Sequence, residues 1–175
     1  MPVPASGGGS SPLDAPYDYA QWGFFFGDTV TREGARRHVH LGTFAAATPI
    51  DRAVLDTASG TATYRGHAAG NVMNGGAVYS AIGTYSDTFD FDRRRGSTML
   101  DFDSRRYGGS SSLDSATYRA RLSGGDRQAA LQGQFGGGME NGRPRAVTGG
   151  FEISNGRSGG SAYRATGIFA GEAGR

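Results

Sequence analysis

Three histidines, His38, His40 and His67, are the first residues whose type and spacing could do chemistry. Because side chains alternate in direction along a strand, His38 and His40 share one face if their segment is extended. Two imidazoles on one face could bind a metal ion, but the spacing supplies no third ligand. We interpret the histidines as exposed polar residues, with haem ligation through His67 or a barrel tyrosine as the weaker alternative.

The most charged stretch of the chain is "DTFDFDRRRGSTMLDFDSRRY", residues 87–107. Its carboxylates could converge across two paired strands and hold a hard cation such as calcium; they are Asp90, Asp92, Asp101 and Asp103. Its guanidinium groups could instead pair with those carboxylates across the strands; they belong to Arg93, Arg94, Arg95, Arg105 and Arg106. We favour this charge ladder, because carboxylates with so many arginines nearby need no metal, and a ladder also discourages edge-to-edge aggregation.

Catalytic motifs are missing from the sequence. It contains no G-x-S-x-G elbow, no H-E-x-x-H and no P-loop, and serine, histidine and aspartate show no triad spacing. The lack of cysteine excludes thiol chemistry and thiolate metal sites. Trp22 and residues 24–26 could form a sticky aromatic patch, but poor alternation around them favours core or barrel-plug packing. We therefore predict a protein that is not an enzyme, with no cofactor and no bound metal.

Composition indicates one folded, glycine-rich β domain. The 175 residues include 31 glycines and 11% aromatic residues, and no strict three-residue glycine period appears. The net charge of +2 comes from arginines spread along the chain, which does not argue for a nucleic-acid partner. No apolar run approaches the roughly 20 residues of a membrane-spanning helix. Residues 1–16 are typical of a flexible Pro/Gly/Ser linker. We therefore expect the domain at 17–175 to be part of a longer exported protein that is tethered to the outer membrane.

From Tyr17 onward, short β-like runs alternate with turn-rich breaks such as "NGG" at 74–76 and "ENGRP" at 140–144. The breaks are short, so consecutive strands should pair antiparallel in hairpin order. A helical turn is expected only within 51–59, and the longer loops within 28–38, 48–59, 107–114 and 137–143. The predicted strands are 19–26, 39–47, 61–72, 77–91, 97–106, 115–123, 128–136, 144–154 and 161–171.

One face of these strands alternates large and small side chains, with glycine next to an aromatic residue in strand after strand. In "GTATYRGHAAGNV" (60–72) that face carries Ala62, Tyr64, Gly66 and Ala68. Small residues relieve crowding on the concave side of a tightly curled sheet, and about eight strands give an interior that side chains can fill. The opposite faces carry Arg, Gln, Thr and Asp, unlike the lipid-facing side of a membrane barrel. The sequence predicts an all-β fold: a small antiparallel, mostly up-and-down eight-stranded soluble β-barrel with an extra N-terminal strand or small handle.

Four motifs resemble the β-barrel module of the transferrin-binding protein B family of Gram-negative surface lipoproteins. They are "YAQWGFFFGD" (19–28), "HLGTFAAATP" (40–49), "GTATYRGHAAGNV" (60–72) and "ATGIFAGE" (165–172). The resemblance covers residues 22–172 and implies an exported barrel at the cell surface or outside the cell. Members of the family bind iron-carrier proteins, complement regulators or haem. This chain has neither a lipidated cysteine nor long gripping loops, so the particular ligand does not carry over.

The leading functional hypothesis is an exported, non-enzymatic module that binds a macromolecular partner, a host protein or another copy in self-assembly, through loops on a rigid barrel. The expected contact residues are Arg36, Arg37, His38, His40, Arg105, Arg106 and Tyr107. One alternative is a structural or assembly module of a larger exported protein. The other is a lipocalin-like carrier of a small apolar ligand or haem, which would need an internal cavity.

Overall fold

The computed structural model describes residues 17–30, 34, 36–157 and 161–174, excluding the side chains of 25–30 and 36–41. The predicted linker at 1–16 lies outside the described residues. Within them the fold is all-β, with one short helix, α1 (Arg52–Leu55). The strands are β1 (Ala20–Val30), β2 (Arg36–Ala47), β3 (Thr61–Asn74), β4 (Ala77–Asp90), β5 (Arg95–Phe102), β6 (Arg105–Asp114), β7 (Thr117–Gly124), β8 (Arg127–Glu140), β9 (Arg143–Ser154) and β10 (Tyr163–Ala173).

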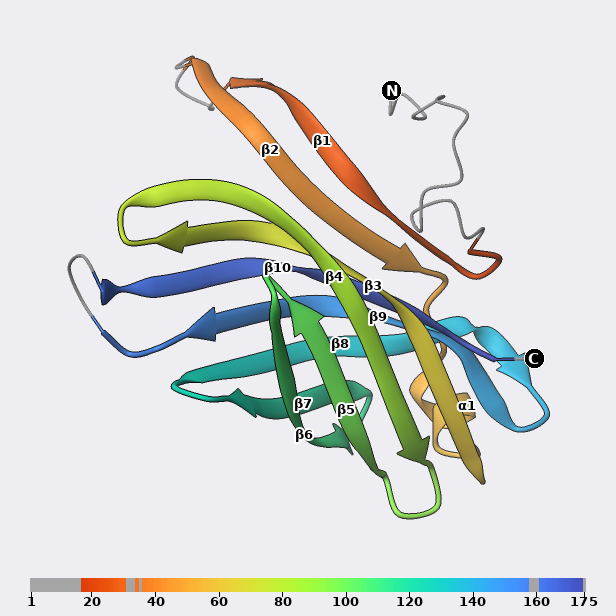
Figure 1. The fold of residues 1–175 in the computed structure, drawn as a ribbon. Coiled ribbons are helices and arrows are strands. Elements are labelled where there is room, and N and C mark those ends of the chain that lie inside the picture. Colours follow the sequence, from red (N-terminus) through yellow and green to blue (C-terminus); the bar gives the residue numbers. More distant parts are fainter. Residues whose placement is uncertain (1–16, 31–33, 35, 158–160, 175) are drawn as a thin grey trace.

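Strands β3 to β10 form a closed barrel in which each strand pairs antiparallel with its neighbour in sequence, and β10 closes the ring against β3 (Figure 1). The predicted eight-stranded, up-and-down antiparallel barrel is therefore confirmed. Strands β1 and β2 form a separate two-stranded sheet, which we call the handle. The handle lies along the outside of the barrel, where it contacts β9 and β10 (Figure 1).

The loop prediction was wrong at 107–114, which belongs to β6, and at 137–143, where 137–140 belong to β8 and Arg143 begins β9. The loop expected at 28–38 is also shorter, because β1 ends at Val30 and β2 begins at Arg36. The predicted strand 97–106 is divided between β5 and β6 by a tight turn at Asp103 and Ser104. Both turn residues have positive φ, 51° and 58°, as two-residue hairpin turns require. Glycine and asparagine are the usual signals of that conformation, so a turn made by aspartate and serine was missed.

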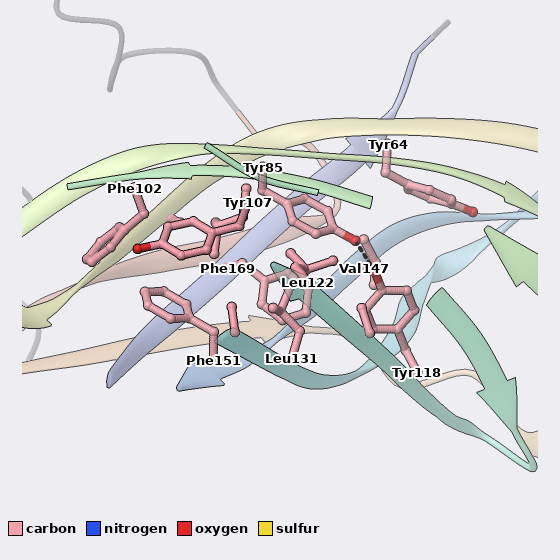
Figure 2. Packing of buried hydrophobic residues seen from close by; sticks show 14 of the residues in the cluster. Tyr64, Tyr85, Phe102, Tyr107, Tyr118, Leu122, Leu131, Val147, Phe151 and Phe169 are labelled. Carbon is pink, nitrogen blue, oxygen red and sulfur yellow. Dashed lines mark hydrogen bonds between the residues drawn. The ribbon is translucent and has the colours of Figure 1, made fainter. Parts of the chain in front are cut away.

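The barrel interior is filled by the predicted large and small side chains. Figure 2 shows rings from several strands meeting at the axis, among them Tyr64, Tyr85, Phe151 and Phe169. Tyr85 stacks on Phe169 with 4.6 Å between ring centroids. Because the rings occupy the axis, the barrel is a packed core and its outer wall carries the accessible side chains.

Glycine is required where strands come closest together. Gly70 on β3 lies opposite Gly167 on β10. A Cβ added to Gly70 would lie 2.9 Å from the Cα of Gly167, and one added to Gly167 would lie 2.6 Å from the ring of Phe151. The predicted role of glycine beside aromatic residues in closing a narrow barrel is thus borne out at this pair.

One end of the barrel is covered by the segment that leads from the handle to β3. The expected helical turn within 51–59 is α1, and it inserts Leu55 into the core. The backbone N–H of Ser59 donates to the carbonyl oxygen of Gly142 at 3.0 Å, which fastens this segment to the β8–β9 turn. No helix among the described residues has the length and hydropathy needed to cross a membrane.

Candidate functional site

The four expected contact residues at 36–40 lie at the start of β2, next to the connection between β1 and β2. Arg36, Arg37 and His38 lie opposite Val30, Thr29 and Asp28 in the handle ladder. The side chains of Arg36, Arg37, His38 and His40 lie outside the described part of the structure. Their role in partner contact stays a prediction.

The other expected contacts, Arg105 and Arg106, lie at the start of β6 on the outside of the barrel. Arg106 donates two hydrogen bonds to the Asp101 carboxylate across the β5–β6 hairpin, at 2.7 and 2.9 Å. Arg105 donates to Asp126 at 2.7 Å and to the carbonyl oxygen of Gly124 at 2.8 Å. The two guanidinium groups hold the pKa values of Asp101 and Asp126 below their ordinary range, since each stabilises a charged carboxylate.

Tyr107 differs from its two neighbours because alternation along β6 turns its side chain into the barrel. Its ring has no exposed surface, and Figure 2 shows it among the core side chains. Its buried hydroxyl lies near the Arg127 guanidinium without a well-formed hydrogen bond. Tyr107 therefore cannot belong to an exposed contact surface, whereas Arg105 and Arg106 can.

The charged hairpin forms two of the ion pairs that the ladder interpretation expected, Arg93 with Asp90 and Arg106 with Asp101, whereas Arg94 and Arg105 pair with Asp56 and Asp126 outside the hairpin. Asp90 accepts a hydrogen bond from Arg93 at 2.8 Å within the β4–β5 turn. Asp103 lies at the opposite end of the hairpin, 3.8 Å from Arg127, and accepts a hydrogen bond from Tyr163 at 2.9 Å. Among the described residues no group of three or more histidines and carboxylates is placed to hold a metal ion.

The handle is fixed to the barrel by polar and aromatic contacts at its base. The Tyr17 hydroxyl lies 2.7 Å from Nδ1 of His67 on the outer face of β3, and the Trp22 ring stacks on the same imidazole at 5.7 Å. Glu172 on β10 accepts hydrogen bonds from the backbone N–H groups of Tyr19 and Ala20, at 2.6 and 2.9 Å. His67 thus joins the handle to the barrel, and Trp22 packs between them instead of forming an open aromatic patch.

A polar cluster inside the barrel was not anticipated from the sequence. Asp87 on β4 is only 1% exposed. Its carboxylate accepts hydrogen bonds from the hydroxyls of Thr98, at 3.0 Å, and Ser111, at 3.0 and 3.2 Å. Tyr118 lies 2.9 Å from the Thr98 hydroxyl and itself accepts a hydrogen bond from Tyr85 at 3.1 Å. Since Thr98 donates its proton to Asp87, Tyr118 is the donor to Thr98, and the hydroxyls form a directed chain that ends on the carboxylate.

Burial raises the pKa of Asp87 from 3.8 to about 6, although the hydroxyl hydrogen bonds act in the opposite direction. No described residue forms an ion pair with this carboxylate. The alternation Tyr85, Asp87, Phe89 along β4 already places Asp87 on the inward face, which is the signal that could have revealed it. Its position in the packed core indicates a structural role.

These features define a class of protein: a filled eight-stranded antiparallel barrel with a two-stranded handle on its outer wall. This is the architecture of the β-barrel module of transferrin-binding protein B, which the sequence motifs resemble. The chain matches transferrin binding protein B (TbpB) from serogroup B Neisseria meningitidis with a TM-score of 0.59, 15% identity and 91% of this chain covered. It matches a TbpB double mutant from Haemophilus parasuis Hp5 with a TM-score of 0.59, 13% identity and 90% coverage.

A second group of solved structures has the same fold. HpuA from Kingella denitrificans, in complex with human haemoglobin, matches with a TM-score of 0.50, 14% identity and 91% of this chain covered. This chain spans only 32–33% of the two TbpB chains and 56% of the HpuA chain. No family model and no curated protein matches the chain. At such low identity these comparisons establish the fold, and the named neighbours are binding proteins.

Proposed function

We propose that this chain is an exported, non-enzymatic binding module, presented at a bacterial surface, that holds a macromolecular partner on the outside of a rigid barrel. The observation that carries the proposal is the match of nine-tenths of the chain to proteins named for binding transferrin or haemoglobin. The packed interior supports it, because rings on the barrel axis leave the outer wall, the loops and the handle as the binding surfaces. The same packing disfavours a lipocalin-like carrier, which needs an internal cavity.

Two parts of the outer surface suit such a partner. The first is the handle. His67 and Glu172 hold its base against the barrel, so the end near the β1–β2 connection can contact a partner while the barrel stays in place. The second is the pair Arg105 and Arg106. Their guanidinium groups already face carboxylates of this chain, so a partner carboxylate would have to share or exchange those hydrogen bonds.

The test is a binding measurement with immobilised transferrin and haemoglobin, the ligands named for the structural neighbours. We expect the purified chain to bind at least one of the two. The double variant Arg105→Ala/Arg106→Ala should weaken binding, because it removes both guanidinium groups from the proposed surface. The matched control Arg52→Ala/Arg93→Ala removes two exposed arginines elsewhere, with 67% and 82% of their side-chain surfaces accessible. Absence of binding to both proteins, or equal loss in the two double variants, would contradict the proposal.

A further inference from the structure

The outer wall of the barrel carries an elongated groove that the proposed protein-binding surface does not use. A hollow of about 640 Å³ lies over β7, β8, β9 and β10, and an adjoining hollow of about 570 Å³ extends it toward the β9–β10 turn. The two share four lining residues, so they form one continuous groove. The shared residues are Arg121, Ala130, Glu152 and Thr166.

The strand register gives the groove a low floor between two arginine-bearing sides. Arg121 on β7 lies opposite Ala130 on β8, and Ala130 lies opposite Glu152 on β9. The floor is low because Ala130 and Gly150 have little or no side chain. Arg119 and Arg121 follow each other on one face of β7, about 7 Å apart, and Arg164 lies three strands away on β10, at about 14 Å.

The positive charge of the groove is only partly offset by carboxylates of the described residues, since Arg157 at one end lies near enough to Asp126 to help lower its pKa. None of its four arginines forms an ion pair with a described residue; they are Arg119, Arg121, Arg157 and Arg164. Most other described arginines do form one; these are Arg52, Arg93, Arg94, Arg105, Arg106, Arg127 and Arg145. Among the described lining residues Glu152 supplies the one carboxylate. A surface that keeps several cations together and unpaired is complementary to an anion.

Three features of the groove restrict what kind of anion would fit. The exposed large apolar side chains of the described residues all lie elsewhere, so the groove lacks the apolar anchor typical of a protein interface. Its described lining presents no exposed aromatic ring on which nucleic-acid bases could stack. Strands β7 to β10 are paired on both sides here, so a peptide cannot add to them as an extra strand.

We propose that this groove binds an acidic polysaccharide. Arginine guanidinium groups donate paired hydrogen bonds to carboxylate or sulfate groups. Gln128, Gln132 and Thr166 line the same groove and offer amide and hydroxyl groups to the hydroxyls of sugar rings. Cations on both sides of a floor formed by the two strands β8 and β9 suit a chain that carries charge along its length. This proposal does not depend on the protein-binding function, because it concerns other side chains and a different class of ligand.

The experiment measures binding of the whole chain to dextran sulfate, to polygalacturonate and to uncharged dextran. Dextran sulfate and dextran share one backbone, so their comparison isolates the anionic groups. We expect binding to both acidic polymers that weakens as salt rises, and none to dextran. Poly-glutamate and a single-stranded oligonucleotide of similar charge are included as competing classes. If either binds more tightly than both acidic polysaccharides, the assignment to a polysaccharide is overturned.

Three variants locate the site. Arg119→Gln/Arg121→Gln should lower the affinity by at least about tenfold, because it removes two charge-assisted contacts. Arg65→Gln/Arg95→Gln removes the same charge from exposed strand arginines outside the groove and should leave the affinity unchanged. Glu152→Gln should raise the affinity, a result that misfolding cannot produce. Equal losses in the two arginine variants, or weaker binding by Glu152→Gln, would refute the site.

Discussion

Replacement of Asp87 by asparagine is expected to stabilise the barrel at neutral pH and to remove part of its pH dependence. The wild-type carboxyl is buried and its pKa is raised from 3.8 to about 6. The folded state therefore holds this proton more tightly than the unfolded chain does. The free energy of unfolding should fall as pH rises from about 4 to about 6, because over that range the folded protein must give up a proton that the unfolded chain has already lost.

The size of the effect follows from the displacement of the pKa. A rise from 3.8 to about 6 corresponds to about 3 kcal/mol of unfavourable free energy above pH 6. Asparagine cannot ionise, so Asp87→Asn should avoid this cost. The asparagine amide can keep the hydrogen bonds of the carboxylate. Its oxygen can still accept from Thr98 and Ser111, and the Ser111 hydroxyl can rotate to accept from the amide nitrogen.

The assay is urea unfolding of wild type and Asp87→Asn at a series of pH values from 4 to 8. We expect the two proteins to have similar stability near pH 4, and the variant to be more stable by up to about 3 kcal/mol above pH 6. The exposed Asp114→Asn serves as a control for the loss of a carboxylate. A variant that is less stable than wild type at pH 7.5, or a difference that stays constant between pH 4 and 7, would refute the reasoning.

Three further predictions test the handle, the closure of the barrel and the exposed ion pair. Trp22 is the one tryptophan of the chain, and it stacks on His67. His67→Ala removes this stacking partner and should shift tryptophan emission to longer wavelength. Unchanged emission would contradict the handle contact. Gly167→Ala should cost about 1–3 kcal/mol in urea unfolding because its new Cβ meets the neighbouring strand and a ring, whereas Gly108→Ala, which meets nothing within 4 Å, should be nearly neutral. Arg106→Ala should leave the unfolding midpoint unchanged, because an exposed ion pair contributes little to stability; a clear loss of stability would show that the pair supports the fold.

The side-chain size pattern was sufficient to predict the barrel. Alternation of aromatic residues with glycine or alanine identified the inward face, and residues such as Tyr118, Leu122 and Phe151 are buried there. The size pattern wrongly predicted buried side chains where a strand extends beyond the end of the strand paired with it. Tyr79 has the parity of an inward residue but is 38% exposed, because β4 pairs with β5 only from Thr84 onward.

Candidate sites were harder to predict because they depend on which strands become neighbours. The partners of Arg105 and Arg106 could be guessed in part, since Asp101 is close in sequence. The arginine groove could not, because Arg121 and Arg164 come to line the same groove only after three strand pairings have formed. His67 has the outward parity that was expected, but its contacts with Tyr17 and Trp22 depend on how the handle packs.

The low identity to the solved structures follows from what each face of the barrel must do. Closure constrains the inward face by size alone, so a large residue can change for another large one while the fold persists, and 13–15% identity coexists with coverage of nine-tenths of this chain. The outward face is under no such constraint, and arginine, glutamine and threonine there contribute little to folding. Proteins of the same fold can therefore differ on the outer wall without loss of the barrel.

Asp87 is an exception, since it is inward yet polar. A buried carboxylate that lowers stability at neutral pH needs another benefit, and its hydrogen bonds to Thr98 on β5 and Ser111 on β6 suggest one. These bonds join three consecutive strands in a single register, and a one-residue slip would break them.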